Sequence, residues 1–249
     1  MNISFIVQAR MGSSRLPEKV MLPFHDNQCI LELLVNKLKK FADSQIIIAT
    51  ADTPENDVIE KFCKTHAIGC YRGSENDVLE RFIKAAETYD AERIIRICSD
   101  NPFIELESLR RLIETARYTQ ADYMSFMVNG TPSIKTHFGF WTEYVTLNAL
   151  KRIRQTTNES IYHEHVTNYI YTHPDKFTIE WIEGPECLKG RYDIRLTCDT
   201  PRDFQNTKEI YRILCARNPY PTIKEITNFL DLHDEYLDTM IQQIKANTK

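Results

Sequence analysis

The chain has 249 residues, of which 42% are hydrophobic, 27% charged and 10% aromatic, as in an ordinary soluble globular protein. Its net charge of −4 excludes a general electrostatic attraction to nucleic acid, so a bound anion must be met by a local cluster of cations. No apolar run has the length of a membrane span, and the N-terminus lacks the basic start and cleavage site of a signal peptide. We therefore expect a protein with no membrane or nucleic-acid partner.

The cysteines point to a reducing compartment. Their number is odd and no C-x-x-C pair occurs, which argues against a disulfide framework or a zinc site and favours reduced thiols in a cytoplasm. Cys70, Cys98 and Cys198 fall in apolar, β-rich stretches and are interpreted as small hydrophobic residues.

The first half of the chain alternates short apolar strands with amphipathic helices. We predict strands over 3–7, 46–50, 68–71 and 93–98. We predict helices over 29–41, from Pro54 onward, over 74–89 and over 105–118. The expected N-cap of the second helix is Asp52 or Thr53, and that of the third is Ser74. This alternation predicts an α/β fold: a doubly wound, mostly parallel sheet with helices on both faces.

The second half is less regular. Strands are expected over 121–126 and 177–182, and helices over 143–153, 159–173, 201–215 and 222–230. No repeat, low-complexity tract or Gly/Ser linker divides the chain. A single domain over 1–249 with an inserted segment is therefore preferred to two domains.

Charged and small residues follow the predicted strands. Ligands of doubly wound sheets bind at the carboxyl ends of strands, so these residues are expected to form one site. The first, third and fourth predicted strands lead to QARMGSSRLPEKV at 8–20, to Arg72 and to Ser99-Asp100-Asn101-Pro102, respectively. The β-like run RYDIRLTCDTP at 191–201 ends near Asp199. The loop at 8–20 contains Arg10, Gly12, Ser13, Arg15 and Lys19.

This mixture of residues suits phosphate chemistry. Lysine, arginine and backbone N–H groups hold a triphosphate, whereas carboxylates repel it unless a divalent cation lies between them. Asp100 and Asp199 are thus candidate Mg2+ ligands. The loop GSSRLPEK is not a Walker A motif, and a lone Gly12 is not a dinucleotide fingerprint.

Taken separately, these features have plainer explanations. A cationic loop is often a solvated turn, Asp100 before Asn-Pro suits a turn, and Asp199 suits the N-cap of a helix that begins at Pro201. Their joint placement after strands favours a site. His163 and His165 lie two residues apart, face different sides of a helix and do not suggest zinc. Helix packing is the interpretation of Tyr89, Tyr118, Tyr169 and Tyr171.

At family level the chain resembles the SpsF family of cytidylyltransferases, which groups with the CMP-KDO and CMP-sialic acid synthetases. The resemblance covers nearly the whole chain and is carried by QARMGSSRLPEKVMLPF, YRGSENDVLERF, RICSDNP, GFWTEYVTLNALKRI, HEHVTNYIYTHPDKF and RLTCDTPRDF. It implies a homodimeric, Rossmann-like nucleotidyltransferase with a small inserted dimerisation segment. Its nucleotide-binding half would span about 1–120, and its acceptor-binding and dimerisation half about 121–249.

The resemblance also implies an activity: transfer of CMP from CTP to an acidic sugar such as a nonulosonic acid or KDO. Pyrophosphate is released, Mg2+ is the cofactor, and the product serves surface polysaccharide or glycan biosynthesis. Lys19, Arg10 and Asp100 would be catalytic, and Asp100 and Asp199 would bind the metal. The nucleotide would be bound by Arg10, Gly12, Ser13, Arg15, Lys19, Arg72 and Ser99.

Two departures from the family pattern concern the acceptor. Ser99-Asp100-Asn101-Pro102 stands where the family usually has Gly-Asp-Cys-Pro, and His163 stands where an arginine is common. We therefore expect the acceptor pocket to differ from that of its relatives.

Three alternatives remain. A phosphorylated acceptor such as a sugar 1-phosphate needs a second cationic cluster, for which Lys135, Arg152, Arg154, Lys189 and Arg191 are available. A glycosyltransferase would normally show Asp-x-Asp after a strand, where this chain has Ser99-Asp100-Asn101. A non-catalytic nucleotide-binding scaffold is disfavoured because both aspartates and all three loop cations are present.

Overall fold

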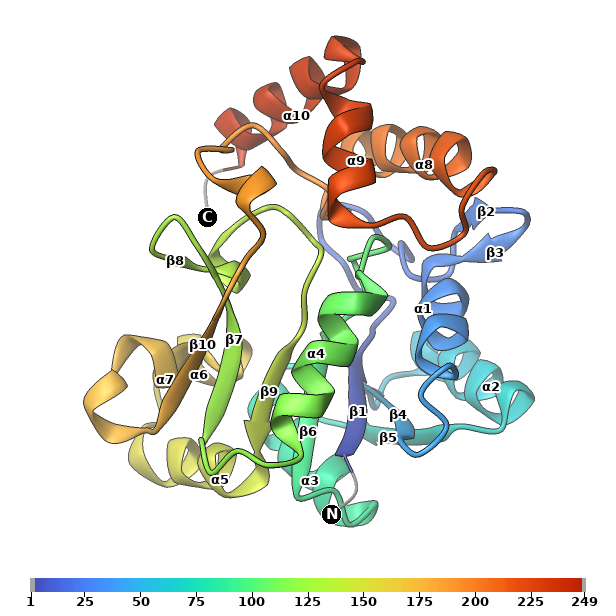
Figure 1. The fold of residues 1–249 in the computed structure, drawn as a ribbon. Helices are drawn as coiled ribbons and strands as arrows, with labels where there is room; N and C mark the ends of the chain where they lie inside the picture. Colours follow the sequence, from blue (N-terminus) through green and yellow to red (C-terminus); the bar gives the residue numbers. More distant parts are fainter. Residues whose placement is uncertain (1–2, 248–249) are drawn as a thin grey trace.

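The fold is a central sheet with helices on both faces, and the computed structural model describes residues 3–247 of it (Figure 1). The strands are β1 (Ile3–Gln8), β2 (Pro23–His25), β3 (Gln28–Cys29), β4 (Gln45–Ala51), β5 (Gly69–Gly73), β6 (Arg93–Cys98), β7 (Tyr123–Val128), β8 (Thr131–Pro132), β9 (Glu143–Thr146) and β10 (Ile179–Glu183). In the main sheet the order is β10-β7-β9-β6-β1-β4-β5, β8 pairs with β7, and β2 and β3 form a separate hairpin.

The predicted parallel sheet is confirmed over its central strands. β1 runs parallel to β4 on one side and to β6 on the other, and β5 is parallel to β4. The chain winds outward from β1 to β5 and then returns to place β6 beside β1, so the strand order reverses there. β9 runs antiparallel to both β6 and β7. The carboxyl ends of β1 and β6 therefore define the crevice where this type of sheet binds ligands.

The helices cover the two faces of the sheet. They are α1 (Ile30–Leu38), α2 (Asp57–His66), α3 (Val78–Thr88), α4 (Leu106–Ala116), α5 (Leu147–Thr156), α6 (Ser160–Glu164), α7 (Asn168–Thr172), α8 (Pro201–Cys215), α9 (Ile223–Leu230) and α10 (Asp234–Ala246). Because side chains alternate along a strand, Phe5 and Val7 join the core with α1, α2 and α4, whereas Ile6 joins the core with α3 and α5.

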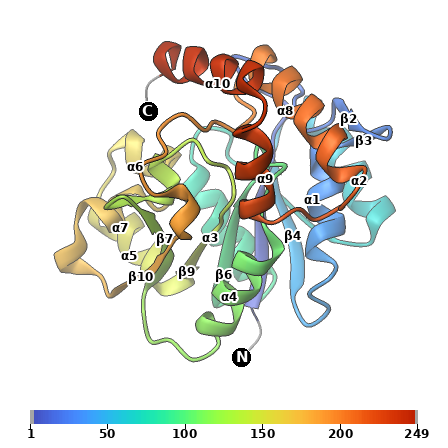
Figure 2. The same ribbon diagram turned by 45° about the horizontal axis from the view of Figure 1, so that its top comes forward.

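The C-terminal helices lie at one end of the sheet. Figures 1 and 2 show α8, α9 and α10 gathered beyond the end of β1 that points away from the N-terminus. They bring the segment before α8 to the carboxyl ends of the central strands. Among residues 3–247 no helix is long and apolar enough to cross a bilayer.

Several sequence predictions need correction. Residues 143–146, expected to begin a helix, form β9, because Tyr144 and Val145 pair with β6 and are buried. The helix expected over 159–173 is broken into α6 and α7 around His165. The β-like run at 191–201 is extended but joins no strand, and its Leu196 and Cys198 amides donate to loop carbonyls.

The helix starts also differ in part from the predictions. The N-cap of α3 is Asp77, not Ser74, and its carboxylate accepts from the Glu80 amide. α8 begins at Pro201 as predicted, but its N-cap is Thr200, which forms a capping box with Asp203. Asp199 is therefore not needed to cap this helix.

Candidate active site

A cavity of about 830 Å³ lies at the carboxyl ends of β1 and β6. Its walls come from the end of β1 and the loop after it, from β6 and the turn after it, from residues 133–143, 164–171 and 195–199, and from Asn247. The predicted site residues that line it are Arg10, Ser13, Arg15, Lys19, Ser99, Asp100 and Asp199. Tertiary structure thus brings together residues that are far apart in the sequence.

The loop after β1 is held by its backbone. The Met11 amide donates to Asn56 Oδ1 at 2.9 Å, and the Met11 carbonyl accepts from the Ser13 and Glu18 amides at 2.9 Å each. Buried Val20 anchors the end of the loop in the core. These contacts fold the loop back on itself, so that its cations line the cavity.

Lys19 lies between the two predicted metal-binding carboxylates. Its Nζ is 3.2 Å from Asp100 Oδ2 and 3.8 Å from Asp199 Oδ1, and it donates to the Cys198 carbonyl at 2.8 Å. Burial lowers the pKa of Lys19, but the negative charges of Asp100 and Asp199 outweigh it and the pKa is raised. Lys19 is therefore a fixed positive charge at the wall of the cavity.

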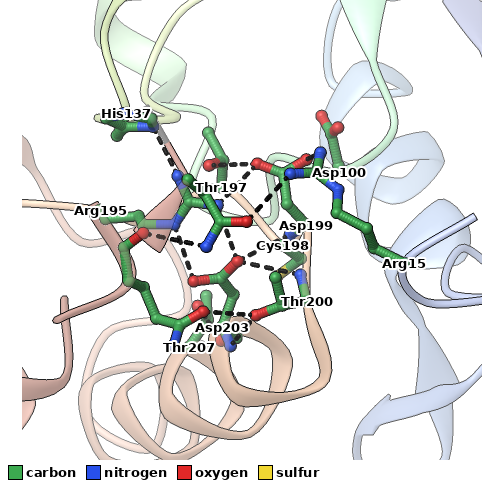
Figure 3. A network of polar contacts seen from close by, with 12 residues as sticks. Arg15, Asp100, His137, Arg195, Thr197, Cys198, Asp199, Thr200, Asp203 and Thr207 are labelled. Carbon is green, nitrogen blue, oxygen red and sulfur yellow. Dashed lines mark hydrogen bonds and ion pairs between the residues drawn. The ribbon is translucent and has the colours of Figure 1, made fainter. Parts of the chain in front are cut away.

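Asp199 is held from both sides (Figure 3). Its Oδ1 faces Arg15 Nη2 at 3.2 Å, and its Oδ2 accepts from Arg195 Nη2 at 3.0 Å and from Thr197 Oγ1 at 3.1 Å. The Arg15 side chain is 52% exposed and that of Asp199 is 12% exposed. Arg15 is thus free to move with a ligand, whereas the carboxylate is fixed.

Two carboxylates on one cavity wall fit a magnesium ion. Mg2+ is commonly bound by one or two carboxylates together with substrate phosphate oxygens, and Asp100 and Asp199 supply such a pair. Both carboxylates contact the Lys19 ammonium group, so they lie on the same part of the cavity wall. Among the described residues no group of three or more His, Cys, Asp or Glu side chains is placed to hold a metal. Phosphate oxygens and water would have to complete the coordination.

Two predicted nucleotide-binding residues do not line the cavity. Gly12 is exposed at the outer side of the loop, where a Cβ atom would lie 3.2 Å from Glu75 Oε1. Arg72 ion-pairs with Asp52, Asp57 and Glu60, at distances of 2.6 to 3.3 Å. Arg72 lies away from the cavity because β5 is at the edge of the sheet and these carboxylates hold its guanidinium there, and its role in nucleotide binding stays a prediction.

The other end of the cavity contains residues that the sequence did not single out. Arg96 and Glu143 form a buried ion pair, and Glu143 also accepts from Tyr123 Oη and from Thr167 Oγ1. Nε of Arg96 has no hydrogen-bond partner within residues 3–247. A charged residue inside the apolar strand RIIRIC was the available signal.

Residues 133–136 and 164–171 complete this end, which is called the acceptor end because both segments fall in the half of the chain predicted to bind the acceptor. Its lining includes Ser133, Lys135, Thr136, Glu164, His165, Thr167, Asn168 and Tyr171. Tyr171 was expected only to pack, yet it lines the cavity with Lys135 Nζ 5.0 Å above its ring. Of the five cations proposed for a second phosphate site, Lys135 lines the cavity, and the other four are ion-paired elsewhere.

His163 and His165 face different directions, as their spacing predicts. His165 lines the cavity, whereas His163 places Nδ1 2.8 Å from Asp77 Oδ2 and Nε2 3.0 Å from the Thr157 carbonyl. Burial lowers the pKa of His163, but these two acceptors outweigh it and the pKa is raised. His163 therefore ties α6 to the start of α3 and does not contact a ligand in the cavity.

Comparison with known proteins identifies the family. The family model described as cytidylyltransferase matches residues 4–245. The spore coat polysaccharide biosynthesis protein SpsF of Bacillus subtilis is 36% identical, over 85% of this chain and 87% of its own. A 3-deoxy-manno-octulosonate cytidylyltransferase of Alteromonas mediterranea is 23% identical, over 65% of this chain and 62% of its own. The solved structure of a cytidylyltransferase from Leptospira borgpetersenii matches with a TM-score of 0.80 and 26% identity, over 95% of this chain and 97% of that one.

Proposed function

This chain belongs to the cytidylyltransferase family, and on that basis we propose that it transfers CMP from CTP to an acidic sugar and releases pyrophosphate. The observation that carries the proposal is the position of Lys19 between Asp100 and Asp199 at the cavity wall, with Arg10 and Arg15 lining the same cavity. Cations for a triphosphate and carboxylates for a divalent metal thereby lie in one place.

In the proposed reaction a hydroxyl oxygen of the acceptor attacks the α-phosphorus of CTP in line. The new oxygen–phosphorus bond forms as the bond to the bridging oxygen of pyrophosphate breaks, and the hydroxyl proton is released to water. Mg2+ bound by Asp100 and Asp199 would supply positive charge to the phosphates and to the attacking oxygen. Little covalent chemistry is asked of the protein, so its contribution is positioning and charge stabilisation.

The cations of the loop hold the leaving group. Lys19 and Arg15 contact carboxylates in this structure, and phosphate oxygens can take their place. Lys19 and Arg15 would then bind the pyrophosphate, and Arg10 would lie over the α- and β-phosphates. Arg10 has no carboxylate partner among residues 3–247 that it would first have to leave.

Lys135 supports an acidic acceptor. It lines the acceptor end together with His165, where a sugar carboxylate would find both side chains, whereas buried Arg96 is already paired with Glu143. The relative named for 3-deoxy-manno-octulosonate agrees with this choice. A phosphorylated acceptor is less well supported, because Arg152, Arg154, Lys189 and Arg191 are ion-paired away from the cavity.

Pyrophosphate release tests the proposal. CTP, UTP, GTP and ATP are each incubated with Mg2+ and a panel of acidic sugars and sugar 1-phosphates, and the pyrophosphate formed is measured. We expect release with CTP and an acidic sugar. Release only with sugar phosphates would support the phosphorylated-acceptor alternative, and CTP binding without release for any acceptor would support the scaffold alternative.

The remaining expectations are proposals of the same kind. The homodimer stays a prediction, which the sedimentation of the purified protein would check. The cytoplasmic location also stays a prediction, as does the division near residue 120.

A further inference from the structure

A second polar network lies behind the cavity wall and is centred on Arg195 (Figure 3). The residue is 1% exposed, although it lines the cavity. Its guanidinium donates from Nε to Asp203 Oδ1 at 2.8 Å and from Nη2 to Asp203 Oδ2 at 2.9 Å. This is a bidentate arginine–carboxylate pair, which fixes direction as well as distance.

Asp203 is itself immobile. Its Oδ2 accepts from the Thr200 amide at 2.9 Å, and its own amide donates to Thr200 Oγ1 at 3.1 Å. These bonds form the capping box of α8, so the carboxylate is attached to the first turn of a 15-residue helix. Arg195 is therefore anchored to a rigid element.

The nitrogen that completes this fork, Nη2, also reaches the candidate metal-binding carboxylate. Arg195 Nη2 also donates to Asp199 Oδ2 at 3.0 Å, where Thr197 Oγ1 donates at 3.1 Å. Oδ1 faces Arg15 and Lys19 instead. One oxygen of Asp199 is thus tied to the protein, and the other is directed to the side where the nucleotide is proposed to bind.

The third edge of the guanidinium contacts the segment that forms the acceptor end. Arg195 Nη1 lies 2.6 Å from His137 Nδ1, and the His137 carbonyl accepts from the Leu196 amide at 2.9 Å. Gly139 has φ +70°, and a Cβ atom there would lie 3.1 Å from the Leu196 backbone. Residues 137–139 therefore run closely against residues 195–197, and Ser133, Lys135 and Thr136 lie just before them in the chain.

We propose that Arg195 is a positioning residue. It orients the Asp199 carboxylate toward the metal and couples this orientation to the position of residues 133–139 at the acceptor end. The inference rests on the proposed function, since it assigns Asp199 to the metal. Arg195 touches neither reactant in this role. Groups that orient metal ligands typically change metal affinity by about 10- to 100-fold when they are lost.

The test measures how much Mn2+ increases the affinity for CTP. Calorimetric titrations with CTP, with and without Mn2+, are compared for the wild type and for the double variant Arg195→Met/Asp203→Asn. The double variant removes both charges of a buried pair, which is often tolerated, and the introduced asparagine keeps a side-chain oxygen for the helix cap. The Mn2+-dependent gain is the factor by which Mn2+ increases the affinity for CTP. We expect this factor to be at least about tenfold smaller in the double variant, with Tm within about 5 °C of the wild type.

Charge and position predict different results for the double variant. It removes one positive and one negative charge, so net charge alone predicts an unchanged metal affinity, whereas loss of the orientation of Asp199 weakens metal binding. An unchanged or larger Mn2+-dependent gain in the folded double variant overturns the inference. Arg195→Lys keeps the charge without the bidentate fork and is expected to lose the gain as well.

Two controls complete the design. Arg191→Met/Asp193→Asn removes a similar pair, with Nε 2.8 Å from Asp193 Oδ1, at a place that does not line the cavity, and it should retain the wild-type gain. His137→Ala should lose part of the gain, and full retention overturns the coupling to the acceptor end. A wild type that binds no CTP, with or without Mn2+, would overturn the proposed function itself.

Discussion

The two ends of the cavity are built differently. The end formed by the loop after β1, the turn after β6 and residues 195–199, here called the nucleotide end, has charged groups that meet across loops. The side chains of Arg15 and Asp100 are 52% and 28% exposed there, and those of Lys19 and Asp199 are 13% and 12% exposed. At the acceptor end, the side chains of Arg96 and Glu143 are 7% and 4% exposed, and both belong to the central sheet. The nucleotide end can exchange its ion pairs for bonds to a ligand, whereas the acceptor end rests on a pair that stays intact.

Because of this difference, we expect substitutions at the two ends to affect different properties, namely turnover at one end and folding stability at the other. Partly exposed ion pairs contribute little to folding, so their residues are free to serve a ligand. A buried pair costs much when one partner is lost, because the remaining charge has no water to solvate it. Substitutions at the nucleotide end should therefore reduce turnover and leave Tm nearly unchanged, and substitutions beneath the acceptor end should do the reverse.

The largest effect on folding is expected for Glu143→Ala. The change leaves the Arg96 guanidinium buried and unpaired, which should cost about 3 to 5 kcal/mol of unfolding free energy. A drop in Tm on the order of 10 °C would follow, measured by calorimetry. Arg96→Met/Glu143→Met should recover most of the loss, and an unchanged Tm for the single variant would contradict the division between the two ends.

At the nucleotide end, Lys19→Ala and Asp100→Asn should slow turnover by several hundredfold. Loss of one preorganised electrostatic contact typically raises the barrier by about 3 to 4 kcal/mol. Pyrophosphate release measures the rate, and Tm should remain near that of the wild type. A variant with near-native turnover would remove its residue from the proposed mechanism.

Lys37 offers a pH-dependent test of the support beneath the nucleotide end. Its buried Nζ donates to the Pro102 and Ile104 carbonyls, just after Asp100, and burial lowers its pKa to about 8. Between pH 8 and the unfolded pKa near 10.5, the unfolded chain binds more protons, so the stability that depends on this group rises with pH.

Chemical denaturation of the wild type and of Lys37→Met at pH 7.5 and pH 10 measures that change. The free energy of unfolding of the wild type should rise relative to the variant by about 2 to 3 kcal/mol. Comparing the two proteins cancels the titration of distant groups. If the difference in unfolding free energy between the two proteins is the same at both pH values, the pKa of Lys37 is not lowered in the folded protein.

The smallest effect is expected for Arg72→Ala. Its guanidinium is held by Asp57 and Glu60 on the surface of the sheet edge and does not line the cavity. Surface substitutions usually change free energies by less than about 0.5 kcal/mol, so turnover should stay within about twofold. A hundredfold loss of turnover would instead show that Arg72 acts at the nucleotide site.

Local patterns in the sequence identified most of the fold. Apolar runs predicted β1, β4 and β6, and Pro201 marked the start of α8, because these signals depend on neighbouring residues alone. The prediction failed at residues 143–146, where the helical periodicity of the following segment was extended into β9. Residues 143–146 form a strand because they pair with β6, and this contact joins residues about 50 positions apart in the sequence.

The sequence by itself determined the chemistry that is available: a cationic loop after the first strand and an aspartate after each of two later segments. Only the tertiary structure decided which of these groups meet. It placed Lys19 between Asp100 and Asp199, kept Arg72 at the sheet edge, and set Arg195 behind Asp199. The reason is physical, because residue type fixes charge and hydrogen-bonding capacity, whereas distance and burial arise only when the strands are ordered in the sheet.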